Sequence, residues 1–168
     1  MRESKTKNVF IIVAEIDPMR VGRPYQAALH CTVMDWFVTE RSVHEISNLV
    51  ECVAVQARPF IIKAGGEEDF GTPDNPLLVN VLENNEDLWA LHNALHSELA
   101  KLKVSYVHPQ YIGKGWRPHV TTQHKTRSLH EGQSHKILAL YLILAKGNIE
   151  HGDKIVQARL ALCDETAA

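Results

Sequence analysis

The sequence carries the same short pattern twice, each time in a segment whose composition is typical of a β-strand. The first copy is Leu29-His30-Cys31-Thr32-Val33 and the second is Pro118-His119-Val120-Thr121-Thr122. Successive side chains of a strand point to opposite faces, so in each copy the imidazole and the hydroxyl share one face, and the apolar middle residue takes the other. The fold therefore has to accommodate two strands that each have one polar face and one buried face.

Length and composition set the size of the fold. A chain of 168 residues with 45% hydrophobic residues can bury one well-packed core, and it is too short for two ordinary domains. No apolar run approaches the roughly 20 residues of a membrane-spanning helix, and the polar residues 1–7 do not resemble a signal peptide. We therefore predict a single cytoplasmic domain over residues 1–168, without a membrane partner, and we expect a monomer.

Net charge and cysteine spacing argue against two classes of function. The formal net charge is −2, so the chain has no overall basic field that would attract a long duplex nucleic acid. Cys31, Cys52 and Cys163 have no metal-ligand spacing, and we assign them no chemistry. A small ligand or a short RNA fits this composition better than long RNA does.

The spacing of apolar residues predicts two helices and about seven strands. Over residues 41–57 apolar side chains recur mostly every three or four positions, with Ser42 as the N-cap and Glu45 three residues later. Residues 86–103 carry a regular row of leucines behind a cap at Asn84 or Asn85. Turn residues separate the strands, which we predict at residues 9–16, 28–34, 60–64, 77–82, 118–123, 137–145 and 155–162.

The order of these elements predicts an α+β domain made of two pseudo-symmetric lobes. Each half of the chain contributes one helix and one His-x-Thr strand, and His30 and His119 are 89 residues apart. A third occurrence, His124-Lys125-Thr126, has a lysine at its middle position and lies in a polar link, so we set it aside. The irregular residues 104–116 lead into the second motif and are suited to form the rim of a site.

The two motifs together supply the groups that phosphodiester cleavage requires. Opening a cyclic phosphate needs a base that takes a proton from water and an acid that protonates the departing oxygen. Two histidines near their ordinary pKa of ~6.5 can hold opposite protonation states at neutral pH. The hydroxyls of Thr32 and Thr121 can donate hydrogen bonds to the phosphate oxygens, where negative charge builds up. This chemistry requires no metal ion and no cofactor.

Both motifs resemble those of the 2H phosphoesterase superfamily, which includes the 2′-5′ RNA ligases and the 2′,3′-cyclic nucleotide phosphodiesterases. The second motif follows Arg117-Pro118, as is common in the ligase-like branch. The chain departs from the family pattern at Thr122, where an apolar residue is usual, and at the following Gln123-His124. The resemblance implies a bilobal α+β fold in which two small antiparallel sheets face each other across a central cleft, with helices packed on the outside.

The resemblance also implies an activity. It is hydrolysis of a 2′,3′-cyclic phosphate, on an RNA end or a small nucleotide, to a 2′-phosphate, with 2′-5′ RNA joining as a reverse reaction. The sequence does not distinguish these substrates from ADP-ribose 1″,2″-cyclic phosphate or a cyclic oligonucleotide. His119 is then the base and His30 the acid. One alternative is a binding module that keeps the fold and holds nucleotides or RNA ends without turnover. A second is a metal-dependent hydrolase that uses the ten histidines.

Several residues near the motifs are candidates for substrate binding. Arg117, Lys125 and Arg127 flank the second motif and can guide a phosphate or an RNA end. Trp116 is the best candidate for stacking on a base, and Tyr25 and Tyr111 are further candidates. We expect Trp36 to pack in the core. On the second predicted helix, His92 and His96 have a spacing that can bind zinc, but no third ligand is evident, so we expect them on an exposed helix face.

Overall fold

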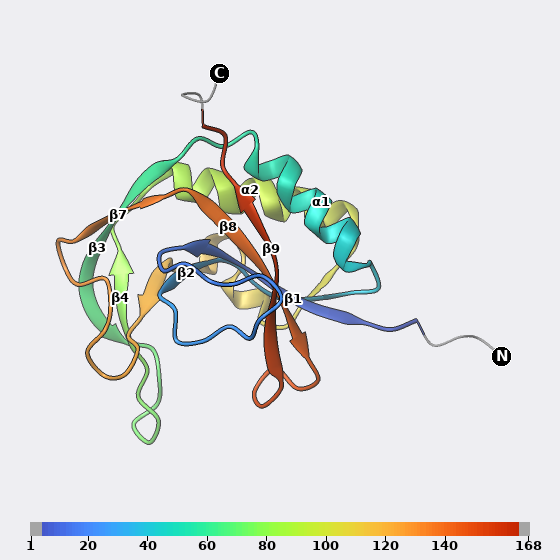
Figure 1. Cartoon of the computed structure of the whole chain (residues 1–168). Coiled ribbons are helices and arrows are strands. Elements are labelled where there is room, and N and C mark those ends of the chain that lie inside the picture. The colour runs from blue at the N-terminus through green and yellow to red at the C-terminus, as the bar shows by residue number, and fades with distance from the viewer. Residues whose placement is uncertain (1–4, 165–168) are drawn as a thin grey trace.

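The computed structural model describes residues 5–164 and consists mainly of β-strands (Figure 1). Its two α-helices are α1 (Val43–Ala54) and α2 (Glu86–Lys101). Two short 3₁₀ turns, η1 (Pro109–Tyr111) and η2 (Gly113–Gly115), follow α2. The strands are β1 (Asn8–Glu15), β2 (His30–Thr39), β3 (Phe60–Asp69), β4 (Leu78–Leu82), β5 (Ser105–Tyr106), β6 (His119–Thr121), β7 (Ser134–Ile137), β8 (Ala139–Lys146) and β9 (Asp153–Ala161).

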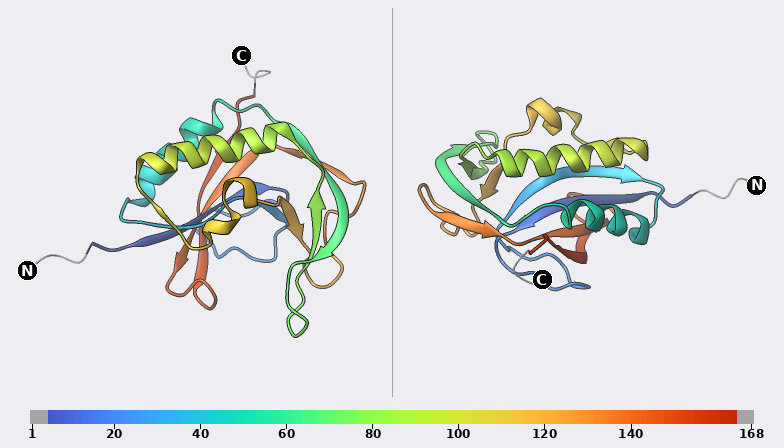
Figure 2. Two further views of the ribbon diagram at one scale, coloured as in Figure 1. Left: turned by 180° about the vertical axis from the view of Figure 1, so that it is seen from behind. Right: turned by 90° about the horizontal axis from the view of Figure 1, so that it is seen from above.

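All of these strands join one curled antiparallel sheet (Figures 1 and 2). The order across the sheet is β7-β3-β4-β6-β2-β1-β8-β9, and β5 pairs with the far end of β2. Helix α1 packs on β8 and β9, helix α2 packs on β2, and the two helices contact each other. Both helices therefore cover the same side of the sheet.

This arrangement confirms the predicted α+β class but not the two facing sheets. The strands that carry the two motifs, β2 and β6, are direct neighbours in one sheet. The alternation of polar and apolar residues fixes which face a side chain takes, but it does not fix which strands pair, because pairing depends on contacts between distant parts of the chain. The two-lobed description therefore stays a proposal.

Apolar residues fill both faces of the central strands. Between the sheet and the helices lies the main core, which includes Phe10, Ile12 and Leu95. On the opposite face a smaller cluster of Ile11, Val13, Trp36, Tyr141, Ile143, Ala145 and Val156 is also buried. The unbroken apolar run of β1 follows from this burial on both sides.

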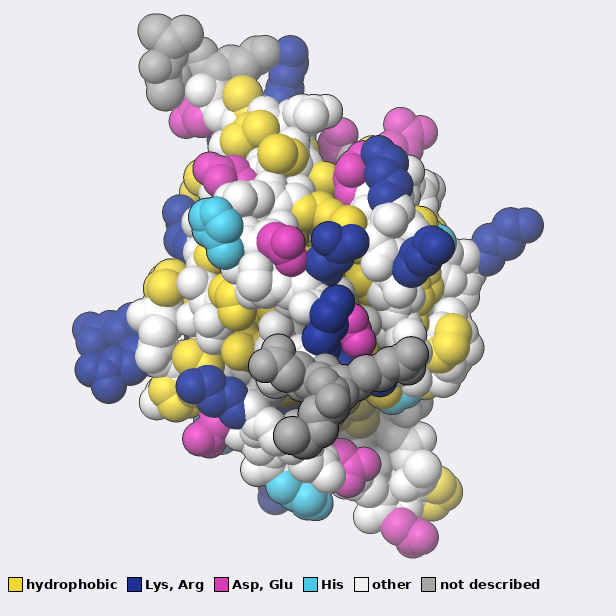
Figure 3. Space-filling model, turned by 90° about the vertical axis from the view of Figure 1, so that its right-hand side faces the viewer, with side chains coloured by type: hydrophobic (Ala, Val, Ile, Leu, Met, Phe, Trp, Pro, Cys, Tyr) yellow, Lys and Arg dark blue, Asp and Glu magenta, His cyan; other side chains and the backbone are white. Residues whose placement is uncertain are grey.

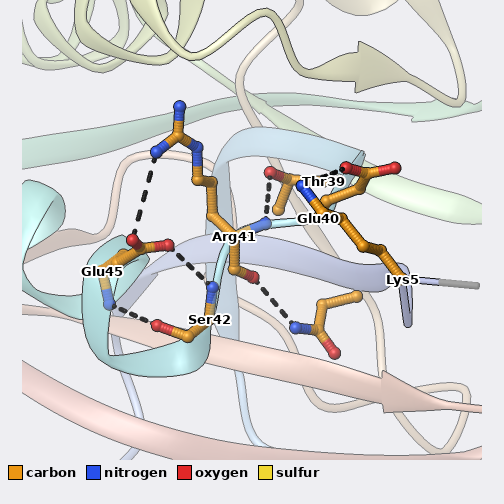
Figure 4. Close-up of polar contacts among 7 residues, drawn as sticks. Lys5, Thr39, Glu40, Arg41, Ser42 and Glu45 are labelled. Atoms are coloured by element: carbon orange, nitrogen blue, oxygen red, sulfur yellow. Dashed lines mark hydrogen bonds and ion pairs between the residues drawn. The ribbon is translucent and has the colours of Figure 1, made fainter. Parts of the chain in front are cut away.

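Helix α1 begins as its sequence predicts. The Ser42 hydroxyl accepts a hydrogen bond from the Glu45 N–H, and the Glu45 carboxylate accepts one from the Ser42 N–H (Figure 4). This reciprocal pair satisfies two N–H groups that a helix start leaves without partners. Asn85 caps α2 in a similar way through the Leu88 N–H.

The strands differ from the prediction mainly in length. β2 and β3 extend to Thr39 and Asp69, well beyond their predicted ends, because both pair with neighbours over that length. β5 and β7 lie in segments that we predicted to be irregular. β7 is polar, and its place in the sheet comes from pairing with β3 rather than from an apolar pattern.

On the face drawn in Figure 3, basic and acidic side chains are interspersed rather than gathered by sign. Within residues 5–164 no helix is long and apolar enough to cross a membrane.

Candidate active site

The two His-x-Thr motifs lie side by side on β2 and β6. Cys31 is the register partner of Val120, and both side chains are fully buried in the main core. Because the strands are antiparallel, this register brings Thr32 toward His119 and His30 toward Thr121, all on the face away from the helices. Side chains directly opposite on such strands have Cβ atoms about 4.5–5.5 Å apart. The four polar groups therefore form one compact cluster.

Both motif histidines are held in the same tautomer. Nδ1 of His30 is 2.9 Å from the Ala28 carbonyl oxygen, and Nδ1 of His119 is 2.8 Å from the Arg117 carbonyl oxygen. A carbonyl only accepts, so each Nδ1 carries the proton and donates it. In each neutral ring Nε2 is then the unprotonated nitrogen, which can accept or, once protonated, deliver a proton.

An aromatic ring also stands edge-on to each histidine. The Tyr25 ring lies 5.1 Å from His30, and the Phe70 ring lies 4.8 Å from His119, both in T-shaped geometry. These contacts limit rotation of the imidazoles and keep water from one side of each ring. The two motif histidines therefore have the same kinds of neighbour, a backbone carbonyl and an aromatic ring, as well as the same sequence pattern.

Burial is the main influence on the acidity of the two histidines. It lowers the pKa of His30 below its ordinary value, and the nearby charge of His119 acts in the same direction. Burial likewise lowers the pKa of His119, while the hydrogen bond to the Arg117 carbonyl and the charge of Asp35 raise it. The neutral form of each imidazole is favoured in the free protein.

A cavity of about 590 Å³ opens over this cluster. His30, Thr32 and His119 line it, whereas Thr121 does not. Its other walls come from β1, β2, β8, β9, the β1–β2 connection, the β3–β4 hairpin and the segment between β5 and β6. The residues are Ile11, Val13, Tyr25, Asp35, Trp36, Phe70, Leu77, His108, Tyr111, Gly115, Trp116, Arg117, Ile143 and Lys154.

The predicted basic residues have different positions. Arg117 lines the cavity, lies over the Phe70 ring at 4.9 Å, and pairs with Glu68 at 2.7 Å. Arg127 does not line it; its guanidinium binds Asp17 and the Ala27 carbonyl oxygen. Lys125 is exposed in a turn, also away from the cavity lining. Of the three, only Arg117 is placed to meet a ligand in this cavity.

Trp116 is not the open stacking platform that its place in a loop predicts. It is 6% exposed, and its ring stacks on His92 with 4.1 Å between the centroids. The indole Nε1–H donates to the Thr32 carbonyl oxygen at 3.2 Å. Tyr25, by contrast, is half-buried and lines the cavity, as a substrate contact requires.

His92 is fully buried, so our expectation of an exposed position was wrong. Its Nδ1–H donates to the Val33 carbonyl oxygen at 2.6 Å, and its Nε2 accepts from the Gly113 N–H at 3.0 Å. Both contacts suit a neutral ring, and burial lowers its pKa. No group of three His, Cys, Asp or Glu residues in the described chain is arranged to hold a metal ion.

Sequence reasoning missed Asp35 and His108 as cavity residues. Alternation along a regular strand places Asp35 on the face opposite Thr32. However, β2 contains two irregularities opposite β1, since Val13 pairs with Thr32, Ile12 with Met34, and Phe10 with Phe37. The first extra residue moves Asp35 to the cavity face, and the second restores the alternation, so that Asp35 lines the cavity together with Thr32 and Trp36. A bulge leaves no reliable signal in a single sequence.

Comparisons with known proteins agree with this fold. The family model described as the 2′-5′ RNA ligase superfamily matches residues 12–151. The structure is similar to E. coli LigT complexed with 3′-AMP, with a TM-score of 0.62, 14% identity, and coverage of 95% of this chain and 100% of that one. It is also similar to TT0787 of Thermus thermophilus, with a TM-score of 0.59, 14% identity, and coverage of 94% and 99%. No curated protein matches the sequence.

Proposed function

The chain belongs to the 2′-5′ RNA ligase superfamily, and from that premise we propose that it is a phosphoesterase that opens a 2′,3′-cyclic phosphate to a 2′-phosphate. The substrate is a nucleotide or the end of a short RNA. Other proteins of this fold bind nucleotides: LigT has been solved with 3′-AMP, with ATP and with NADP+.

One observation carries the proposal: the two motif histidines have matched environments on adjacent strands. Each donates Nδ1–H to the carbonyl two residues before it and contacts an aromatic ring edge-on. Acid and base catalysis on one phosphate needs two nitrogens fixed on either side of the phosphorus atom. A structural role for these histidines accounts less well for such matching around a shared cavity.

In the proposed reaction, Nε2 of His119 accepts a proton from a water molecule as the water oxygen bonds to phosphorus. The bond between phosphorus and O3′ breaks, and O3′ takes the proton from Nε2 of His30, which leaves the phosphate on O2′. His30 must therefore start protonated and His119 neutral. Attack by the 5′-hydroxyl of a second RNA in place of water would form a 2′-5′ linkage.

The charge that builds on the phosphate oxygens needs donors. The Thr32 hydroxyl lies beside His119 on the cavity wall, and Thr121 lies beside His30. Removing one donor of this kind typically lowers the rate about 10²-fold. Arg117 adds a positive charge at the cavity that attracts the phosphate already in the bound substrate.

The test is hydrolysis of a 2′,3′-cyclic mononucleotide and of a short RNA with a cyclic phosphate end, both in EDTA. Wild type is compared with His30→Ala and His119→Ala, and His44→Ala on the exposed surface of α1 is the matched control. We expect turnover by wild type and the control, loss of about 10³-fold or more in both motif variants, and a 2′-phosphate product.

Three results would overturn the proposal in different ways. Activity that EDTA abolishes would favour a metal-dependent hydrolase. Binding of both substrates without turnover would favour a binding module. Retention of activity in a folded His30→Ala or His119→Ala variant would remove that histidine from the mechanism.

A further inference from the structure

We propose that Asp35 and His108 form a nucleobase subsite that selects guanine, next to the phosphate site of the proposed phosphoesterase, on which this inference rests. The two side chains are hydrogen bonded, with 2.8 Å between His108 Nδ1 and Asp35 Oδ2. Both line the cavity that also contains His30 and His119. The proposed mechanism uses neither of them.

The position of Asp35 suits the base of a bound nucleotide. It is three residues beyond Thr32 on β2, which is at most about 10 Å along the strand. This is close to the span from the phosphate of a nucleotide to the far edge of its base. A nucleotide with its phosphate between the histidines can therefore place its base edge at Asp35.

The hydrogen-bonding atoms that Asp35 has left free are acceptors. The His108 Nδ1–H is used by Asp35 Oδ2, so Asp35 offers Oδ1 and the remaining lone pairs of its carboxylate. The Asp35 side chain is only 17% exposed and that of His108 is 42% exposed, so the carboxylate is partly shielded from water. A partly buried carboxylate has to be matched by donors on the ligand.

Guanine is the base whose edge matches these acceptors best. Its N1–H and its amino group are adjacent donors and can both point at one carboxylate. Adenine and cytosine present an amino group beside an acceptor nitrogen, and uracil presents one N–H between two carbonyls. The carboxylate also repels a second phosphate, which favours a base rather than a polyphosphate at this end of the cavity.

An aromatic side chain and a well-fixed backbone segment lie beside Asp35 and His108, and both suit the binding of a planar base. Tyr111 lines the cavity, is 51% exposed, and lies 5.6 Å from the His108 ring. The segment that carries His108 is fixed to β2, since Tyr106 pairs with Phe37 and the Val107 N–H donates to the Trp36 carbonyl oxygen. A base at Asp35 can stack on Tyr111 without a large rearrangement of this loop.

The experiment measures kcat/KM for the four 2′,3′-cyclic mononucleotides with wild type and with Asp35→Asn. We expect wild type to prefer guanosine by about tenfold over uridine, which is within the usual discrimination of a two-point base contact. The Asp35→Asn amide puts a donor where guanine needs an acceptor, so the ratio of kcat/KM for guanosine to that for uridine falls to about one. The ratio is the readout because the lost charge near His119 changes the rates for all four bases alike. Asp87→Asn at the start of α2 is the matched control and keeps the wild-type preference.

Two further arms separate this inference from the proposed function and from a role of Asp35 near His119. Binding of 2′-GMP and 2′-UMP is measured by calorimetry, so a guanine preference that Asp35→Asn removes supports the subsite even if no cyclic phosphate is hydrolysed. Trinucleotides ending in guanosine or uridine cyclic phosphate show whether an RNA end uses the same subsite. Equal rates and equal binding for all bases in wild type, or an equal loss for all bases in Asp35→Asn, would overturn the inference.

Discussion

The imidazole of His92 lies parallel to the indole of Trp116, with 4.1 Å between the ring centroids and 7° between the ring planes. The pair closes a gap at the edge of β2, which β6 covers at Cys31 and β5 covers at Phe37. Between these two points on β2, the Trp116 indole N–H donates to the Thr32 carbonyl oxygen, and the His92 Nδ1–H donates to the Val33 carbonyl oxygen. These side chains thus replace a neighbouring strand and satisfy buried carbonyls beside the first motif.

We expect His92→Ala to lower the free energy of unfolding by about 2–4 kcal/mol. The substitution removes a stacked ring and leaves the buried Val33 carbonyl and the Gly113 N–H without their partners. Urea unfolding followed by fluorescence measures the effect. His96→Ala, one turn later on α2 and only half-buried, is the control and should lose less than half as much. Equal losses in the two variants would contradict this role of His92.

We expect the stability of the protein to fall as the pH drops below about 6.5, and His92 to contribute. Burial lowers the pKa of His92 in the folded protein, so the unfolded chain binds a proton at a higher pH than the folded chain does. Protons therefore favour unfolding across the interval between the two pKa values. His92→Gln has an amide donor and acceptor but does not titrate. Its loss of stability between pH 7.5 and 5.5 should be smaller than that of wild type, and an equal loss would contradict the prediction.

Much of the fold follows from local sequence patterns. The capping box at Ser42 and Glu45 and the leucine row of α2 predict both helices, because helix formation depends on contacts within a few residues. The polar strand β7 and the pairing of β2 with β6 depend on distant partners. A single sequence contains no direct signal for such pairing, and the two facing sheets that we expected are not confirmed by the strand order.

In the candidate site, too, the features that depend on local sequence were predicted, and those that depend on distant contacts were not. Strand alternation correctly predicts that His30 and Thr32 share a face opposite the buried Cys31. It misplaces Asp35 because the irregular pairing of β2 shifts the alternation. It also cannot distinguish the exposed face of a helix from a buried polar contact, which is why the environment of His92 emerged only from the structure.

The pH dependence of kcat/KM should be a bell with its maximum below about pH 6.5. Burial lowers the pKa of both His30 and His119, and the proposed mechanism needs one of them protonated and the other neutral. In the free enzyme that combination is most populated between the two lowered pKa values. Initial rates at low substrate concentration between pH 4.5 and 9 measure the profile. A maximum above pH 7.5 would contradict the assigned environments.

Cys31 should be far less reactive than the other cysteines in the folded protein. Burial raises its pKa to about 12, whereas Cys52 and Cys163 are exposed. The thiolate is the reactive form, so iodoacetamide at pH 8 should modify two cysteines in the native protein and all three in urea. Mass spectrometry of the digested protein identifies the sites. Rapid native modification of Cys31 would show that the motif strand opens readily.

Arg117 and Arg127 should differ in their effect on substrate binding, although both flank the second motif. Both arginines are ion-paired, Arg117 with Glu68 and Arg127 with Asp17, but only Arg117 lines the cavity. A charge-assisted contact to phosphate is worth enough that Arg117→Ala should raise KM about tenfold, with kcat changed less than about threefold. Arg127→Ala should leave KM within about twofold of wild type. Arg117→Lys keeps the charge and should recover part of the loss, less so at high salt, where a screened charge contributes little. A larger KM effect of Arg127→Ala than of Arg117→Ala would contradict this prediction. It would mean that the substrate contacts the loop that contains Arg127, outside the cavity lining.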